Sequence, residues 1–259
     1  LVVSNKILRF AKINKVLSFK RNLLFLTLSL FILFQSSIVF PQNIFNESQI
    51  KDFEKIIEHW IEKNPKKVKQ VLDNLVAQEE KDHNNKTFKM LSDHSMDPVM
   101  GNPEGDVTVY EFFDYNCGYC KSVFNTVIKT LDNDKNTKLV LKELPILSQT
   151  SINASFFALA AKKQNLYSEF HTKIMQFRGR LTDEKLLEIA KQVGLDIEKL
   201  KKDIQSDEIK LTIEKNKILA ERLKITGTPT FVIGNTIIPG ALNEEQLLKY
   251  IEKVRNENF

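Results

Sequence analysis

The spacing of apolar residues predicts a helical N-terminal part. From residue 47 to about residue 85 the chain is charged and contains no glycine. Two short apolar stripes run through it with the three-to-four-residue period of an α-helix. The first consists of Ile50, Phe53, Ile57 and Trp60, and the second of Val68, Val71, Leu72, Leu75 and Val76. Between them, Asn64 and Pro65 suit an N-cap and a first helical turn, so we expect two helices.

The pattern changes after this helical segment, which we place at residues 44–92. Residues 93–106 hold two prolines and two glycines, which predicts a linker or turn. Residues 107–115 are rich in β-branched and aromatic residues and predict a buried strand, which a helix follows to about Leu131. A second strand is expected at residues 138–144, where Pro145 ends it.

The rest of the chain predicts a helical block, a strand pair and a last helix. Residues 148–222 have a helical period almost throughout, with turns near Gly179 and Gly194. The strand pair, 227–234 and 236–239, turns at Gly234 and Asn235, and the last helix starts at Asn243. We therefore expect an α/β domain at 107–259 with a helical insertion at about 148–222, preceded by the N-terminal helical segment.

The net charge of +5 belongs to the start of the chain. Residues 1–43 contain six basic residues and no acid, and the remainder has 32 basic and 33 acidic residues. A nucleic-acid-binding protein would carry its basic residues in the folded domain, so this class is excluded.

A leader is expected at residues 1–43. The basic stretch ends at Lys20 and Arg21, an apolar stretch covers residues 23–34, and small polar residues follow. This order is typical of a secretory signal peptide. The alternative is an uncleaved membrane anchor over residues 23–40, near the lower length limit for a membrane-crossing helix. Both interpretations place the rest of the chain outside the cytosol, in the periplasm or otherwise exported.

The chain has two cysteines, Cys117 and Cys120, at the junction of a predicted strand and a predicted helix. A helix N-terminus favours a thiolate, so Cys117 is the expected nucleophile and Cys120, one turn later, the resolving thiol. A disulfide framework would need more cysteines, spread along the chain. A zinc site would need four ligands, and the four histidines are scattered, so we expect no metal. His171 is expected to pack or cap the insertion.

Two motifs resemble the DsbA family of the thioredoxin superfamily, and in particular its ScsC/Com1-like bacterial members with an extra N-terminal helical segment. They are GNPEGDVTVYEFFDYNCGYC at residues 101–120 and GTPTFVIG at residues 227–234. The resemblance spans about residues 95–255. It implies a thioredoxin fold and a redox-active Cys117–Cys120 disulfide with no other cofactor.

The resemblance also implies roles for further residues. Pro229 would be a cis-proline opposite the cysteines, with Thr228 before it, and both would contact substrate. Gly118 and Tyr119 would tune the pair. Glu111, on the strand before Cys117, would be a buried acid that moves the proton of Cys120, and the alternative is an exposed glutamate at a sheet edge.

The dipeptide between the cysteines and the threonine before the proline are similar to those of DsbC-like isomerases. The implied function is therefore thiol–disulfide exchange on secreted proteins, as an isomerase or reductase. One alternative is a disulfide-donating oxidase of the DsbA type, served by a membrane redox partner. Another is a non-enzymatic surface or metal-carrying binding protein. The helices at 44–92 are the expected oligomerisation segment, and the alternative is that they pack on their own domain.

Overall fold

The computed structural model of the chain describes residues 45–257. The predicted leader lies outside these residues. Between residues 45 and 257 no helix is long and apolar enough to cross a membrane. The chain forms two compact units, and the boundary lies between Asp73 and Asn74.

The first unit holds helix α2 (Glu47–Lys63) and the start of α3 (Pro65–Ser92). A capping box starts α2, in which the Gln49 N–H donates to Asn46 Oδ1 at 2.9 Å and the Asn46 N–H donates to Gln49 Oε1 at 3.0 Å. The break before Pro65 lies where the sequence predicts it. No residue of α2 is buried, and its apolar stripe faces solvent.

The second unit is built on a sheet of five strands in the order β1-β3-β2-β4-β5. The strands are β1 (Val99–Gly101), β2 (Val107–Phe113), β3 (Thr137–Glu143), β4 (Thr230–Ile233) and β5 (Thr236–Pro239). β2 and β3 run parallel, and the other neighbouring pairs are antiparallel. Because both faces of the sheet are covered, the central strands are apolar on both sides.

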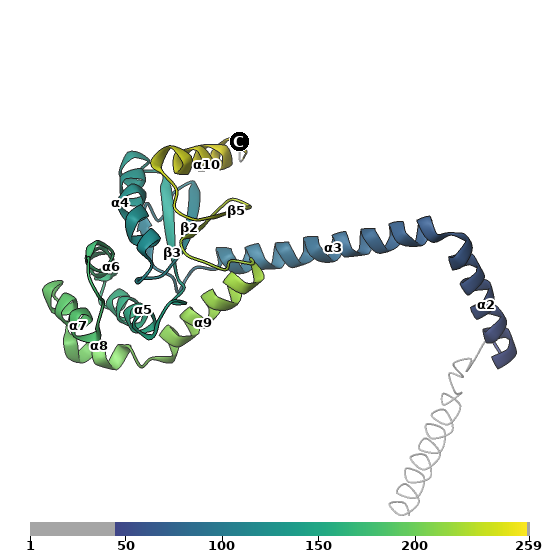
Figure 1. Cartoon of the computed structure of the whole chain (residues 1–259), viewed down its shortest axis with the longest axis horizontal. Coiled ribbons are helices and arrows are strands. Elements are labelled where there is room, and N and C mark those ends of the chain that lie inside the picture. Colours follow the sequence, from purple (N-terminus) through teal and green to yellow (C-terminus); the bar gives the residue numbers. More distant parts are fainter. Residues whose placement is uncertain (1–44, 258–259) are drawn as a thin grey trace, which may run out of the picture. The chain divides into compact units, whose positions relative to one another are not determined.

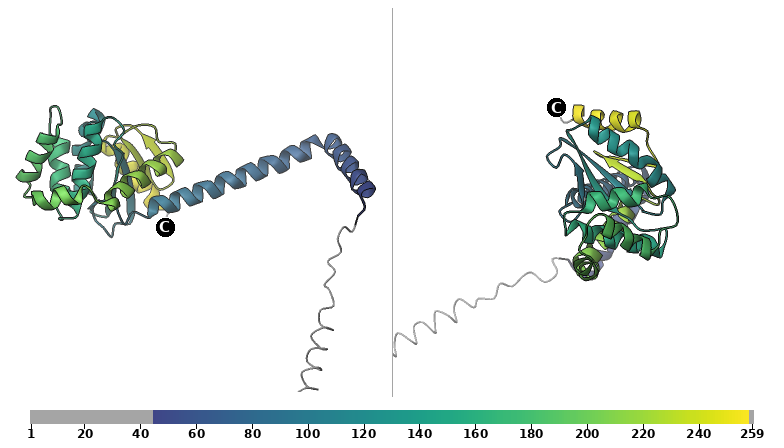
Figure 2. Two further views of the ribbon diagram at one scale, coloured as in Figure 1. Left: turned by 90° about the horizontal axis from the view of Figure 1, so that it is seen from below. Right: turned by 90° about the vertical axis from the view of Figure 1, so that its left-hand side faces the viewer.

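Helices cover the two faces. On one face, Val109 and Phe113 of β2 belong to a core that includes residues of α4 (Gly118–Asn133) and α10 (Glu244–Glu257). On the other face, Tyr110 and Phe112 join a second core with residues of α9 (Asp207–Arg222). The helical insertion lies between β3 and β4, and α5 to α8 stay together beside the strands (Figures 1 and 2). Its helices are α5 (Gln149–Lys162), α6 (Tyr167–Gln176), α7 (Asp183–Gln192), α8 (Ile197–Asp203) and α9 (Asp207–Arg222). This is the α/β domain with a helical insertion that the sequence predicts.

Helix α3 continues to Ser92. Its last turns are part of the second unit, because Leu91 is buried in the second core with Tyr110 and Phe112. Thr87 is also buried, and its hydroxyl donates to the carbonyl of His83 at 2.8 Å. A fragment that starts after residue 92 would therefore lack part of this core.

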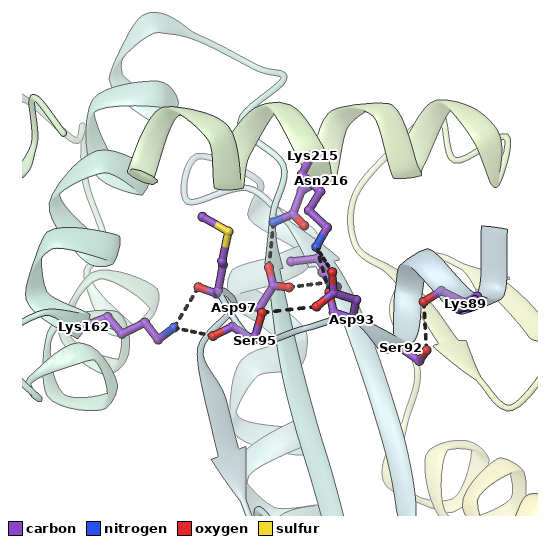
Figure 3. Close-up of polar contacts among 10 residues, drawn as sticks. Lys89, Ser92, Asp93, Ser95, Asp97, Lys162, Lys215 and Asn216 are labelled. Carbon is purple, nitrogen blue, oxygen red and sulfur yellow. Dashed lines mark hydrogen bonds and ion pairs between the residues drawn. The ribbon is translucent and has the colours of Figure 1, made fainter. Parts of the chain in front are cut away.

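Residues 93–106, expected to be a linker or turn, contain turns and the short strand β1, and charged side chains hold them on the domain (Figure 3). Asp97 is buried, and its carboxylate pairs with Lys142 Nζ at 2.5 Å and accepts from Asn216 Nδ2 at 3.0 Å. Lys162 Nζ donates to the Met96 carbonyl at 2.8 Å. The two prolines, Pro98 and Pro103, lie just outside the short edge strand β1, so neither removes a donor from the sheet.

Candidate active site

Cys117 lies between the end of β2 and the start of α4, where it is the N-cap residue of the helix. Its sulfur accepts from the N–H of Cys120 at 3.4 Å. The sequence folds this way because the apolar strand before it is buried and an N-cap accepts the unpaired N–H groups of the first helical turn. The sulfur therefore lies at the positive end of the helix dipole.

Hydrogen bonds lower the pKa of Cys117 to about 5. The largest contribution comes from the Cys120 thiol, and burial opposes it. The Thr228 side chain and the N–H groups of Cys120 and Tyr119 also stabilise the thiolate. In the neutral thiol, the Cys117 S–H donates to the Thr228 carbonyl at 3.1 Å, which favours the protonated form. The hydrogen bonds to the thiolate outweigh burial and the contact with the Thr228 carbonyl, so Cys117 is ionised at neutral pH.

Cys120 has the opposite environment. It is fully buried, and burial raises the pKa of its thiol far above the usual range, with smaller contributions from the Cys117 hydrogen bond and the charge of Glu111. Both cysteines are free thiols in this structure. The pair thus consists of one ionised thiol at the helix start and one protonated thiol behind it.

The other residues expected at the site lie around this pair. Gly118 and Tyr119 are exposed, and Tyr119 is 72% accessible to solvent. The Thr228–Pro229 peptide bond is cis, and the Thr228 carbonyl contacts the Cys117 sulfur. Thr228 and Pro229 also line a shallow cavity of about 280 Å³ with Ile237 of β5.

Glu111 is buried in the middle of β2, so the alternative of an exposed edge position is wrong. Its Oε1 atom has no hydrogen-bond partner among residues 45–257. Burial, and then the charge of Cys117, raise the pKa of Glu111 to about 8. A carboxyl group with this pKa can accept or release a proton near neutrality, which is the property that a proton carrier for Cys120 requires.

The Glu111→Gln variant is expected to be more stable than the wild type at pH 8 and little changed near pH 4.5. The raised pKa means that the folded wild type favours the protonated Glu111 carboxyl. The folded wild type therefore has its full stability at low pH and loses part of it as pH rises from about 4.5 to about 8, whereas a glutamine stays neutral. Urea unfolding should show a gain on the order of a few kcal/mol at pH 8. If the free energies of unfolding of variant and wild type differed by the same amount at both pH values, the raised pKa assigned to Glu111 would be wrong.

Glu143 supplies a contrasting variant. Burial raises the pKa of Glu143 to about 8 as well, but its carboxyl oxygens accept from Tyr115 Oη at 3.1 Å, Tyr167 Oη at 2.8 Å and Ser155 Oγ at 2.7 Å. His171 Nδ1 lies 2.9 Å from Tyr115 Oη. We expect Glu143→Gln to destabilise the fold, because the substitution weakens three buried hydrogen bonds.

Sequence reasoning did not identify this network. His171 packs inside the insertion as expected, and burial lowers its pKa to about 3. Glu143 ends a buried strand and immediately precedes the Leu144–Pro145 pair, a position where an acid needs a buried partner. That signal was available, but the partners come from three separate segments: Tyr115 from the loop before α4, Ser155 from α5 and Tyr167 from α6. Within residues 45–257, no group of three or more His, Cys, Asp and Glu side chains is arranged as metal ligands.

Comparison with known protein families and structures agrees with this geometry. Residues 108–252 match the model of the DSBA-like thioredoxin domain. A thioredoxin-like oxidoreductase from Silicibacter pomeroyi DSS-3 is 41% identical, with a TM-score of 0.62, over 62% of this chain and 94% of that one. The catalytic domain of Proteus mirabilis ScsC is 26% identical, with a TM-score of 0.61, over 67% of this chain and 97% of that one. These matches confirm the predicted thioredoxin fold and the resemblance to ScsC.

Relatives with similar sequences differ in how much of their length is matched. A probable disulfide bond formation protein D from Bacillus anthracis is 29% identical over 192 residues, which are 69% of this chain and 85% of that protein. The Na⁺/H⁺ antiporter NhaA 1 of Salinispora arenicola is 28% identical over 160 residues. That match covers 60% of this chain and 24% of the antiporter, so the likeness concerns one part of it.

Proposed function

We propose that Cys117 and Cys120 exchange disulfides with exported proteins, because the chain belongs to the DSBA-like thioredoxin domain family and is a thiol–disulfide oxidoreductase. The observation that carries this proposal is the difference between the two thiols. Cys117 has a pKa of about 5 at a helix start, and the buried Cys120 is protonated behind it. A nucleophile and a resolving thiol require this pair of properties.

The proposed reaction has two steps. In the first, the Cys117 thiolate attacks one sulfur of a substrate disulfide, a mixed disulfide forms, and the other substrate sulfur leaves as a thiolate. In the second, Cys120 transfers its proton to Glu111 and attacks the Cys117 sulfur. The substrate leaves reduced, and Cys117 and Cys120 are joined by a disulfide. The reverse sequence oxidises a substrate dithiol.

The direction that we favour is isomerisation or reduction. Its support is the sequence around the cysteines, since Gly118, Tyr119 and Thr228 are similar to the residues of DsbC-like isomerases. One observation favours the oxidase instead. A thiolate with a pKa of about 5 stabilises the reduced protein, and that makes the disulfide form more oxidising. This pKa lies between those of thioredoxin, about 7, and DsbA, about 3.5.

We further propose that the N-terminal helices join copies of this chain. Exposed large apolar side chains are concentrated there: Phe45, Ile50, Phe53, Ile56, Ile57, Trp60, Ile61, Val71, Leu72, Leu75 and Val76. Two helices without a core of their own gain stability mainly by packing an apolar face on a partner. A second copy presents the same stripe, so the surface is complementary to itself.

The proposed substrates are unfolded or wrongly oxidised proteins outside the cytosol, and the proposed redox partner is a membrane protein. The export of the chain rests on the leader pattern at residues 1–43. Insulin reduction by the purified protein with dithiothreitol tests the activity. We expect insulin to precipitate faster than with dithiothreitol alone, and an unchanged rate would overturn the proposed function.

A further inference from the structure

A short loop, residues 114–116, joins β2 to the nucleophile. β2 ends at Phe113, and Cys117 is the N-cap residue of α4. The Cys117 N–H donates to the Asp114 carbonyl at 3.0 Å, which closes one turn of the backbone. A single turn fixes a loop weakly, so the position of the Cys117 sulfur depends on what holds the side chains of these three residues.

Tyr115 anchors the loop in the buried network around Glu143. Its side chain is buried, and its Oη atom donates to Glu143 Oε1 at 3.1 Å and lies 2.9 Å from His171 Nδ1. Glu143 is the last residue of β3, and His171 belongs to α6 of the helical insertion. The His171 ring also packs on Phe124 of α4, with 5.5 Å between the ring centroids. One histidine of the insertion thus contacts both the loop before the nucleophile and the helix after it.

Asn116, immediately before Cys117, is attached to the start of α5, the first helix of the insertion. Its Nδ2 atom lies 2.9 Å from Ser148 Oγ and 3.0 Å from both Thr150 Oγ1 and Ser151 Oγ. Ser148 is the N-cap residue of α5, and its Oγ atom accepts from the Ser151 N–H at 3.1 Å. Asn116 therefore binds hydroxyl groups whose own positions are fixed by the start of a helix.

Asp114 binds the segment between these two anchor points. Its carboxyl is buried, and Oδ2 accepts from the Ile146 N–H at 2.9 Å and from the Leu147 N–H at 3.0 Å. Its Oδ1 atom accepts from the Asn116 N–H at 2.7 Å. Three consecutive side chains before the nucleophile are therefore bound to the end of β3, to the loop after it and to the insertion.

The hydrogen bonds of the Cys117 sulfur tolerate little movement. The sulfur accepts from the Cys120 N–H at 3.4 Å. Hydrogen bonds weaken steeply as their distance and angle depart from the optimum. A loop that lost its anchors would therefore move the sulfur away from the N–H groups that stabilise the thiolate.

We propose that Tyr115 and Asn116 are positioning residues, through which the helical insertion holds the Cys117 sulfur at the N-cap of α4. This inference rests on the proposed function, because it concerns how the nucleophile is kept reactive. Both residues act through the loop, since the hydrogen bonds of their side chains go to β3, α5 and α6. The insertion thus takes part in setting the reactivity of the thiol.

The pH dependence of alkylation by iodoacetamide tests the proposal. In Tyr115→Phe/Asn116→Ala, the pH at which Cys117 reacts at half of its maximal rate should rise from near 5 by about one unit. Phenylalanine keeps the buried ring of Tyr115 and removes the hydroxyl alone. Neither substitution alters Cys120 or Glu111, the ionisable groups that interact with Cys117.

Tyr167→Phe is the matched control. It removes another hydroxyl that donates to Glu143 Oε1, at 2.8 Å, but Tyr167 belongs to α6 and not to the loop before Cys117. This variant should be less stable in urea than the wild type, because a buried hydrogen bond is lost. Its Cys117 midpoint should stay at the wild-type pH.

The equilibrium with glutathione supplies a second readout that a loss of stability alone would not change. A less stable thiolate makes the reduced protein less favourable. At pH 7, a rise of one unit in the Cys117 midpoint should lower the equilibrium constant for reduction of the Cys117–Cys120 disulfide about tenfold in the double variant. Tyr167→Phe should keep the wild-type constant.

The outcomes separate this inference from the proposed function. If the double variant keeps the wild-type midpoint, or if Tyr167→Phe raises the midpoint equally, the positioning role is wrong. Asn116→Ala alone leaves the bonds of Glu143 intact and should also raise the midpoint, so the test remains if the double variant does not fold. Alkylation needs no substrate disulfide, whereas a failure of the wild type to reduce insulin would overturn the proposed function.

Discussion

The Cys117→Ser variant is expected to lose insulin reduction almost completely, by at least about a thousandfold, since serine cannot supply a thiolate. The Cys120→Ser variant should behave differently. It keeps the nucleophile and its position at the start of α4, but no buried thiol can release the substrate. Cys120→Ser should therefore accumulate mixed disulfides, which non-reducing electrophoresis detects.

Asn125→Ser is a suitable control for both variants, because Asn125 is an exposed residue of the same helix. It should reduce insulin at the wild-type rate. The assigned order of the two thiols would be wrong if Cys117→Ser kept more than a few per cent of the activity. It would also be wrong if Cys117→Ser, rather than Cys120→Ser, accumulated the mixed disulfide, because that disulfide would then be on Cys120.

Substituting the apolar stripe of α2 is expected to produce a monomer that reduces insulin but loses most of its ability to rearrange scrambled ribonuclease. Phe53→Ser/Trp60→Ser removes two aromatic side chains whose burial between copies would stabilise an oligomer by several kcal/mol. Joined catalytic domains hold one reactive site near another, which raises the effective concentration of the second site. A single domain would lose that advantage.

The same double variant has a matched control in Lys51→Ser/Lys55→Ser, which changes exposed charged residues of the same helix. Light scattering on each protein gives the mass in solution. A wild-type protein that is monomeric would contradict the oligomerisation proposal, and the oxidase reading would then be preferred. Truncation is a second route, but it should stop near Asp82, because Leu91 and Thr87 belong to the catalytic domain.

The parts of the fold that depend on local pattern could be predicted from the sequence. Cys117 was placed at a strand–helix junction because an apolar, β-branched run precedes it and a helical period follows. The break before Pro65 was predicted because proline suits the first turn of a helix. The helical insertion was predicted because its periodicity continues from about residue 148 to residue 222.

The parts that depend on long-range contacts could not be predicted in the same way. β1 has three residues and forms only by pairing with β3, about forty residues later. Asp97 looks like a turn residue in the sequence, and only the fold shows that it pairs with the buried Lys142. Asp114 and Asn116 were not recognised because their partners lie more than thirty residues away. Glu143 was missed because its three partners come from separate segments of the chain, between 12 and 28 residues away.

The pH dependence of Cys117 alkylation tests the central claim most directly. The reduced protein is treated with iodoacetamide from pH 4 to pH 9, and the modified cysteine is located by mass spectrometry. Because hydrogen bonds lower the pKa of Cys117 to about 5, the rate should reach half of its maximum near pH 5, with Cys117 modified and Cys120 unmodified. A midpoint near the ordinary thiol value of about 8.5, or labelling that occurs first at Cys120, would contradict the account.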